Sequence, residues 1–163
     1  MSLIEELLAA NERYASTFQK GELPLPPARR LAIVTCMDAR IDPARILGLE
    51  EGDAHVIRNA GGRTAEALRS LIISQQLLGT TTILVIHHTD CGMLTFENAD
   101  LQRRLQEQFG ADASGIDFLP FKDLEQSVRD DIALLRSSPF LLKESEIIGF
   151  VYDVHSGRLL PVH

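Results

Sequence analysis

The sequence contains no tryptophan, only two cysteines, and no uncharged apolar run near the ~20 residues that a transmembrane helix needs. Its first residues lack both the basic start and the apolar stretch of a secretion signal. Basic residues are also scarce, since 16 Lys and Arg stand against 23 Asp and Glu. We therefore expect no nucleic-acid partner and no membrane partner, and a cytoplasmic location in which thiols stay reduced.

The remaining composition is that of an ordinary globular protein. Of the 163 residues, 45% are hydrophobic and 24% are charged. Neither a disordered chain nor a repeat array has this balance, and the length suits a single folding unit. We therefore predict one domain over residues 1–163.

The N-terminal segment predicts a helix carried on a stiff arm. Apolar residues in segment 2–18 form one stripe at helical spacing: Ile4, Leu7, Leu8, Tyr14 and Phe18. The proline-rich stretch 21–27 then excludes helix and favours an extended connector. The stripe must be buried either in its own core or on a second subunit, and we favour packing of residues 1–27 on a partner subunit.

Strand and helix patterns alternate through the rest of the chain. Strands are expected over 31–35, 54–58, 81–86, 147–154 and 158–162, and helices over 44–49, 64–78, 101–109 and 123–136. Thr64 is expected to cap the second of these helices, and Gly79 to end it. This order predicts an α/β fold with a mostly parallel sheet of about five strands, an antiparallel edge strand and helices on both faces.

Two of the clearest strands end in potential metal ligands. The first runs into Cys36, and the second ends at His88 with Cys91 three residues on. If these strands are neighbours, the three donors meet at one edge of the sheet, and such a Cys₂His set suits Zn²⁺. Three protein ligands leave one tetrahedral position open, which distinguishes a catalytic site from a structural one. Asp38 is the nearest candidate for a fourth protein ligand.

Only one of the two adjacent histidines can face this site, because successive strand side chains point to opposite faces. The H-x-x-C spacing selects His88 and leaves His87 as a packed neighbour. The remaining histidines, His55, His155 and His163, show no ligand spacing.

Asp38 and Arg40 lie two residues apart, so in an extended segment they point to the same side and can pair. The carboxylate could then accept the proton of a zinc-bound hydroxide, while Arg40 holds it ionised and away from the metal. Taken singly, a buried cysteine is usually a core residue, and an Asp-x-Arg pair is usually an ion pair on the surface. Because the cysteines and the Asp38–Arg40 pair all lie at the ends of predicted strands, together they favour a metal site. The turn that follows Arg58 and Asn59 could border the pocket or serve conformation alone.

The segments C-M-D-A-R (36–40) and H-T-D-C-G (88–92) closely resemble the zinc-binding motifs of the β-class carbonic anhydrases. The likeness extends to segments 58–61 and 147–153 and to the turn 156–157, so it spans nearly the whole chain. The short length resembles the compact microbial branch of that family.

The resemblance implies reversible hydration of carbon dioxide to bicarbonate and a proton, by attack of a zinc-bound hydroxide. It assigns one Zn²⁺ to Cys36, His88 and Cys91, and the orienting role to Asp38 and Arg40. It also implies homodimers or larger homo-oligomers, built through sheets and N-terminal helices. In some members the aspartate itself binds zinc, and the sequence does not reveal which state prevails.

Three other functions compete with this interpretation. Related proteins of the same fold hydrolyse carbon disulfide or carbonyl sulfide, and the ligand set does not separate those substrates from carbon dioxide. A non-catalytic zinc-binding module would have no use for the Asp38–Arg40 pair. A thiol hydrolase with Cys91 as nucleophile and His88 as base would lack an orienting third group and an oxyanion turn.

Overall fold

A computed structural model describes residues 1–163 of the protein. Its centre is one five-stranded sheet in the spatial order β2-β1-β3-β4-β5. The strands are β1 (Leu31–Cys36), β2 (Ala54–Asn59), β3 (Thr82–His88), β4 (Glu146–Tyr152) and β5 (Leu159–Val162). The first four are parallel and β5 is antiparallel to β4, which confirms the predicted sheet.

The parallel register brings the carboxyl ends of β1 and β3 to the same edge of the sheet. Thr35 pairs with Ile86, so Cys36 and His88 both leave the sheet at that edge. Strand β3 runs two residues farther than the sequence predicts, because His87 and His88 pair with Val151 and Tyr152 of β4. The two histidines are therefore held as rigid strand residues.

Five helices accompany the sheet: α1 (Leu3–Ser16), α2 (Pro43–Leu47), α3 (Leu68–Leu78), α4 (Asn98–Phe109) and α5 (Leu124–Ser137). Helices α3 and α5 cover one face, where Val34, Val85 and Val128 belong to the larger hydrophobic cluster. The opposite face carries Ile33 and Ile86 and is covered by α2 and loops. Helices thus lie on both faces, although the second face has only the five-residue α2.

The predicted start of α3 is wrong, since α3 begins at Leu68 rather than after a cap at Thr64. Residues Thr64–Glu66 form a short 3₁₀ turn instead. The backbone N–H and the hydroxyl of Thr64 both donate to Asp131, at 3.1 and 3.0 Å, so this residue is tied to α5 and caps nothing. The predicted end is confirmed, since Gly79 takes the left-handed conformation at φ 77°. Helix α4, by contrast, begins earlier than predicted, at Asn98 rather than at residue 101.

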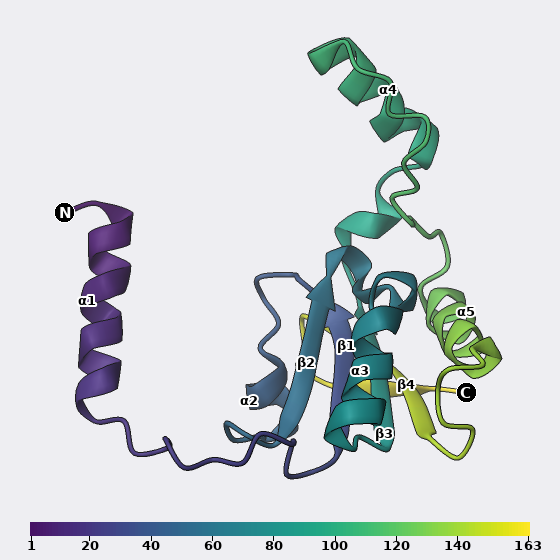
Figure 1. Cartoon of the computed structure of the whole chain (residues 1–163). Coiled ribbons are helices and arrows are strands. Elements are labelled where there is room, and N and C mark those ends of the chain that lie inside the picture. Colours follow the sequence, from purple (N-terminus) through teal and green to yellow (C-terminus); the bar gives the residue numbers. More distant parts are fainter.

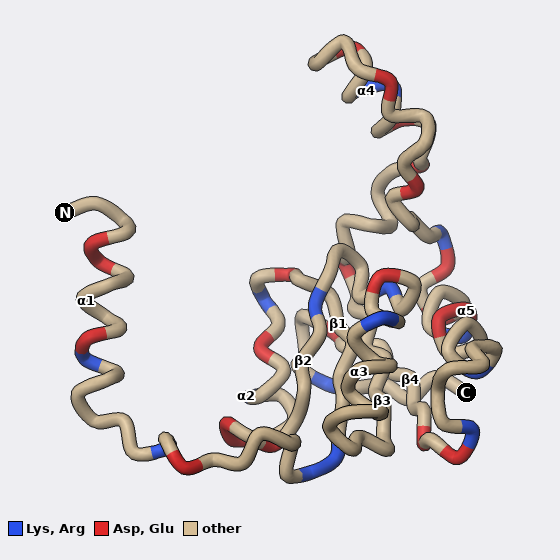
Figure 2. Tube along the Cα trace, viewed as in Figure 1, with Lys and Arg blue, Asp and Glu red and all other residues tan.

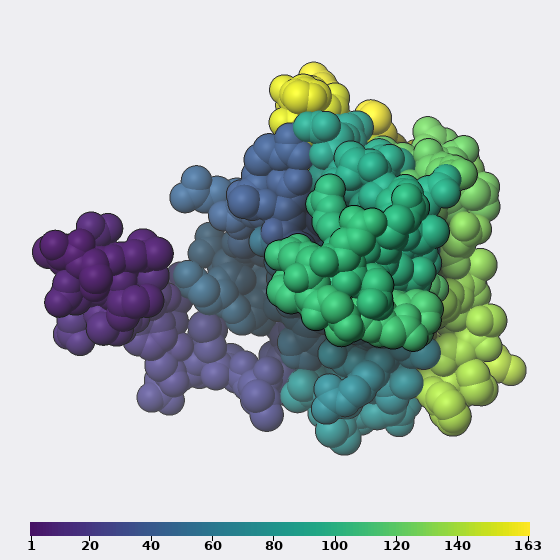
Figure 3. Space-filling model, turned by 90° about the horizontal axis from the view of Figure 1, so that it is seen from above, coloured from purple at the N-terminus to yellow at the C-terminus, as the bar shows by residue number.

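Helix α1 forms as predicted, with Ser2 and Glu5 in a capping box, but it stands away from the sheet (Figure 1). None of its residues is buried, and its apolar stripe is open, with Leu7 55% and Leu8 61% exposed. The view from above shows the same separation (Figure 3). The stripe is therefore not buried by its own chain.

Helix α4 also projects from the sheet, together with the loop that follows it (Figure 1). It is held mainly by that loop: Gln102 Nε2 donates to Ile116 O at 2.8 Å, and Asn98 Nδ2 to Asp117 Oδ1 at 2.8 Å. Acidic and basic residues are interspersed over the surface, and both kinds occur in the two projecting helices (Figure 2). No helix combines the length and the apolarity that crossing a bilayer requires.

Candidate metal centre

Three metal-binding side chains converge at the carboxyl edge of the sheet. Cys36 ends β1, His88 ends β3, and Cys91 follows β3 directly. Their ligand atoms all lie within 4.8 Å of one another, and all three side chains are buried. The structure therefore brings together the three potential zinc ligands of the two motifs.

The imidazole of His88 is oriented for coordination. Its Nδ1 lies 2.7 Å from Thr89 O, and because a carbonyl only accepts, Nδ1 carries the proton. The other nitrogen, Nε2, is buried and has no hydrogen-bond partner. A buried polar atom without a partner is rare in native proteins, and a lone pair fixed in this way is typical of a metal ligand.

A hydrogen bond between the two thiols moves their pKa values in opposite directions. A hydrogen bond from Cys91 lowers the pKa of Cys36 to about 4, against the effect of burial, and Gly61 N also donates to Cys36 Sγ at 3.3 Å. The same hydrogen bond, together with burial, raises the pKa of Cys91. Because the thiolate is the form that binds metals, the pair already holds one ligand in its binding state.

These donors fit a zinc ion. Two thiolates and one imidazole are a preferred set for Zn²⁺, and they neutralise its charge. With three protein ligands, one tetrahedral position remains for water or substrate. The unpartnered Nε2 of His88 is the observation in this structure that a bound ion explains.

Asp38 lies beside this cluster and is held by Arg40. Arg40 Nε donates to Asp38 Oδ1 at 3.0 Å, and Nη2 donates to Oδ2 at 2.8 Å. This two-point contact holds the pKa of Asp38 far below its usual range. The carboxylate is thus ionised and fixed in direction beside the metal ligands.

Two further residues hold this pair, and sequence reasoning assigned a role to neither. Arg40 Nη1 donates to Asp90 Oδ2 at 2.8 Å, and Nη2 donates to Asp90 O at 3.0 Å. Arg58 donates to the backbone oxygens of Cys36 and Asp38, at 3.0 and 2.8 Å. Arg58 therefore supports the conformation of the segment, while the turn that follows it borders the pocket through Ala60 and Gly61, one of the two roles that the sequence left open. An acidic residue inside the H-x-x-C motif was the available signal for Asp90.

The cluster opens into a cavity of about 290 Å³ with mostly apolar walls. The lining residues are Cys36, Met37, Asp38, Ala39, Ala60, Gly61, Cys91, Gly92 and Met93.

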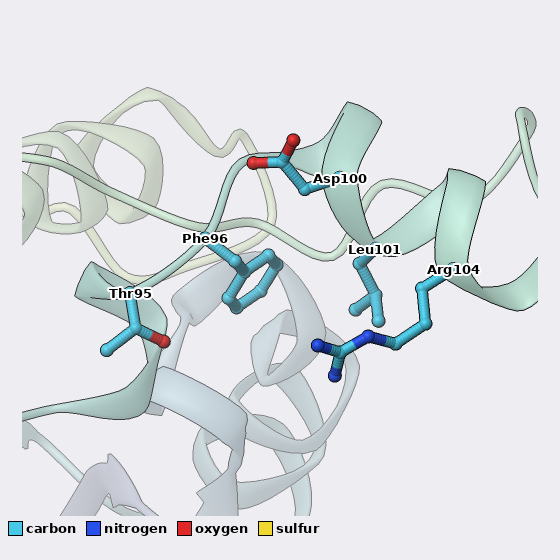
Figure 4. Close-up of a pocket in the computed structure, with 5 residues that line it drawn as sticks. All are labelled: Thr95, Phe96, Asp100, Leu101 and Arg104. Atoms are coloured by element: carbon cyan, nitrogen blue, oxygen red, sulfur yellow. The ribbon is translucent and has the colours of Figure 1, made fainter.

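A second hollow of about 270 Å³ lies between Phe96 and α4 (Figure 4). It contains no pair of metal ligands, and its carboxylate, Asp100, is bonded to Arg103 and to Glu97 N. Only the first cavity combines reactive groups with a small apolar space.

His87 packs on the other side of the sheet from His88, as predicted. It is fully buried, and its ring nitrogens contact Ser127 Oγ at 2.8 Å, Gly62 O at 3.2 Å and Asp131 Oδ2 at 3.1 Å. Of the other histidines, His55 bonds to Ser74 Oγ at 2.7 Å. The last two, His155 and His163, are exposed.

Asp131 is a buried acidic residue that the sequence analysis did not select. It lies within the apolar stripe of its helix, between Val128 and Leu135, and is 2% exposed. A carboxylate at a core position of an amphipathic helix is unusual unless it is paired, so its placement in the stripe was a usable signal.

Comparisons with known proteins agree with this geometry. The family profile described as "Carbonic anhydrase" matches residues 31–159. The chain is 47% identical over 165 residues to Beta-carbonic anhydrase 1 of Mycobacterium tuberculosis, covering 99% of each chain. It is 32% identical over 185 residues to a carbon disulfide hydrolase of Saccharolobus solfataricus, covering 98% of this chain and 89% of the relative. The structure of carbonic anhydrase from Streptococcus mutans superposes with a TM-score of 0.95 at 50% identity, covering 100% of this chain and 99% of that one.

Proposed function

Because this chain belongs to the β-carbonic anhydrase family, we propose that Cys36, His88 and Cys91 hold its zinc and that Asp38 and Arg40 orient the attacking water. The protein is a lyase that catalyses the zinc-dependent, reversible hydration of carbon dioxide to bicarbonate and a proton. Zinc in such a site supplies Lewis acidity, which brings the pKa of water towards neutrality.

One observation carries the assignment of the ligands: the buried, unpartnered Nε2 of His88 lies within 4.8 Å of the sulfurs of Cys36 and Cys91. A core histidine would have found a polar partner, as His87 does with three. Two cysteines placed only as core filler would not leave an imidazole nitrogen buried and free beside them.

Asp38 directs the nucleophile through its ionised carboxylate. Arg40 donates to both oxygens of that carboxylate. Because the pKa of Asp38 is lowered, the carboxylate stays ionised and can only accept hydrogen bonds. An attacking oxygen must therefore donate a hydrogen bond to Asp38, which fixes the lone pair that faces the carbon atom of the substrate. Orientation of this kind lowers the entropic part of the barrier.

The cavity suits a small apolar substrate better than a charged product. Ala60, Met93 and the backbone at Gly92 line it beside the metal ligands. Carbon dioxide gains from contact with such a surface, whereas the bicarbonate anion, near the carboxylate of Asp38, does not. This difference favours binding of the substrate and release of the product.

The test is metal analysis with stopped-flow measurement of carbon dioxide hydration, on the wild type and on Cys36→Ser. We expect one zinc per chain in the wild type, and loss of both zinc and activity in the variant. Ser137→Ala, at the exposed end of α5, is the control and should retain both. Active protein without zinc would contradict the assignment. Release of sulfide from carbon disulfide without carbon dioxide hydration would instead favour the hydrolase function.

We further propose that the arm, residues 1–27, packs on a second copy of the chain to give a homodimer or a larger homo-oligomer. The exposed apolar stripe of α1 supports this, because burying side chains such as Leu7 and Leu8 in an interface removes apolar surface from water and stabilises the complex. We place the protein in the cytoplasm, because free cysteines that bind metal require a compartment in which thiols stay reduced.

A further inference from the structure

One buried carboxylate, that of Asp131, lies outside the cavity of the proposed metal centre. Asp131 of α5 accepts from Arg63 Nε and Nη2 at 2.9 to 3.2 Å and from Thr64 N at 3.1 Å. His87 Nε2 lies 3.1 Å from Asp131 and 3.2 Å from Gly62 O, and since both only accept, Nε2 donates. The Asp131 cluster, defined as Asp131, Arg63, Thr64 and His87, thus satisfies its buried charge completely.

The cluster joins segments that are distant in the chain. Arg63 Nη1 donates to Leu119 O at 2.8 Å, and the guanidinium lies 5.2 Å from the ring centre of Phe121. The ring of His87 stacks on the same phenyl ring at 5.4 Å. Helix α5, the end of β3, the turn after β2 and the segment that returns from α4 therefore all meet at the Asp131 cluster.

One of these segments reaches the metal ligands. The Gly61–Gly62 turn lies between the cluster and Cys36, and Gly61 N donates to Cys36 Sγ at 3.3 Å. Gly62 sits so close to β1 that a Cβ atom there would lie 2.8 Å from Thr35 C and 2.9 Å from Cys36 N. On its other side, Gly62 O accepts from His87. A displacement of this turn is therefore transmitted directly to the sulfur of Cys36.

We propose that Asp131 is a positioning residue of the metal centre: by holding Arg63, Thr64 and His87 it fixes the Gly61–Gly62 turn, and through that turn it aims the sulfur of Cys36. This inference rests on the proposed function, in which Cys36 is a zinc ligand. Asp131 touches neither ligand nor cavity and acts only through the turn.

A role in stability alone explains the cluster less well. Replacing a buried ion pair by apolar residues of similar volume is often neutral or stabilising, because the desolvation of two charges offsets their attraction. Unlike apolar packing, the ion cluster supplies direction, since several of its hydrogen bonds end on backbone atoms, those of Thr64, Gly62 and Leu119. The segment nearest the metal is the one that bonds to the sulfur.

The test compares Asp131→Asn with Asp130→Asn. Asp130 is the adjacent residue on α5, is exposed, and accepts only from Gln126 Nε2 at 2.9 Å, so the same substitution leaves the cluster intact. In Asp131→Asn the amide NH₂ must face a donor, which leaves one hydrogen bond of the cluster unmade. Arg63→Lys is the second variant: it keeps the positive charge but removes the two-point contact with Asp131 and the bond to Leu119.

Zinc affinity is measured by competition with a chromophoric chelator on the folded proteins, and the ligand geometry by the absorption spectrum of the cobalt-substituted proteins. We expect zinc affinity to fall about 10- to 100-fold in Asp131→Asn and in Arg63→Lys, with an altered cobalt spectrum, and to stay unchanged in Asp130→Asn. If Asp131→Asn does not fold, Arg63→Lys decides the question by the same two measurements.

Wild-type affinity and spectrum in the folded variants, even with a lowered melting temperature, would overturn the inference and leave the proposed function standing. Failure of the wild-type chain itself to bind zinc would overturn the proposed function and the inference together.

Discussion

The carboxylate of Asp38 lies 3.7 Å from the free nitrogen of His88, measured from Oδ2 to Nε2, while Arg40 grips both of its oxygens. Asp38 is thus close to the metal ligands without being one of their cluster. Two groups approach Asp38 Oδ2: Arg40 Nη2, which donates to it at 2.8 Å, and Nε2 of His88, one of the proposed zinc ligands. Arg40 donates to both oxygens of this carboxylate, which favours Asp38 as a neighbour of the proposed zinc ligands rather than as a fourth ligand.

Substitution of Asp38 by Asn should separate zinc binding from catalysis. The amide NH₂ must face either Arg40 or the attacking oxygen, so the side chain no longer both binds Arg40 at two points and orients that oxygen. We therefore expect kcat to fall about 100-fold or more. Zinc content should stay at one per chain, because the three ligands are untouched. Metal analysis and stopped-flow kinetics on the same preparation check this. An unchanged hydration rate would favour a non-catalytic zinc-binding module.

Removal of the Asp90 side chain should loosen Arg40 and, through it, Asp38. Asp90 has a φ of 54°, so Asp90→Gly removes the carboxylate without straining the backbone, whereas Asp90→Asn keeps an acceptor and tolerates the conformation. Because Arg40 and Asp90 are both well exposed, we expect kcat/KM to fall only about two- to five-fold in Asp90→Gly and less in Asp90→Asn. Wild-type kinetics in the glycine variant would show that Arg40 needs no second support.

Chelation of zinc should lower the stability of the protein. An ion that binds only the folded chain, at a free concentration about 1,000 times its Kd, contributes about 4 kcal/mol. For a chain of this length that corresponds to a fall of about 8–16 °C in Tm on removal of the ion. Calorimetry with and without chelator measures it, and Cys36→Ser should show no such shift. A chelator effect of equal size in that variant would mean that zinc stabilises the chain from another site.

Polar substitution of the α1 stripe should weaken self-association. Each leucine that is buried at an interface contributes about 1.5–3 kcal/mol, so Leu7→Gln with Leu8→Gln should raise the dissociation constant at least 100-fold. The matched control is Glu12→Gln, which lies off the stripe and is exposed. Sedimentation velocity over a range of concentrations distinguishes the proteins. Identical distributions for the double variant and the control would exclude α1 from the interface.

Acid should destabilise the protein partly through Asp131. Burial tends to raise the pKa of this carboxyl, but hydrogen bonds from His87 and Arg63 outweigh burial and lower it. A group whose pKa is lowered on folding stabilises the protein above its unfolded pKa of ~4, and this contribution is lost as the pH falls through the folded pKa. Urea unfolding between pH 6 and 3 should therefore show a smaller acid loss in Asp131→Asn than in wild type. Parallel curves would show that other carboxyls account for the acid sensitivity.

Most of the fold could be read from local patterns. Short β-branched runs marked the strands, and Pro43 after Asp42 and the left-handed Gly79 marked helix ends, because each of these signals acts within a few residues. The wrong start of α3 has a long-range cause. Thr64 is engaged by Asp131, which lies 67 residues away, so its capping preference is not expressed.

The sequence by itself determined the chemistry of the centre: two thiols and an imidazole at the ends of buried strands, with an Asp-x-Arg pair beside them. Only the tertiary structure decided how these groups are held, since Asp90 on Arg40 and Asp131 behind the glycine turn are contacts between distant segments. The physical reason is the difference in sequence separation between the interactions involved. Strand propensity and ligand type are properties of a few neighbouring residues, whereas the direction of a side chain in a site depends on every segment that packs against it.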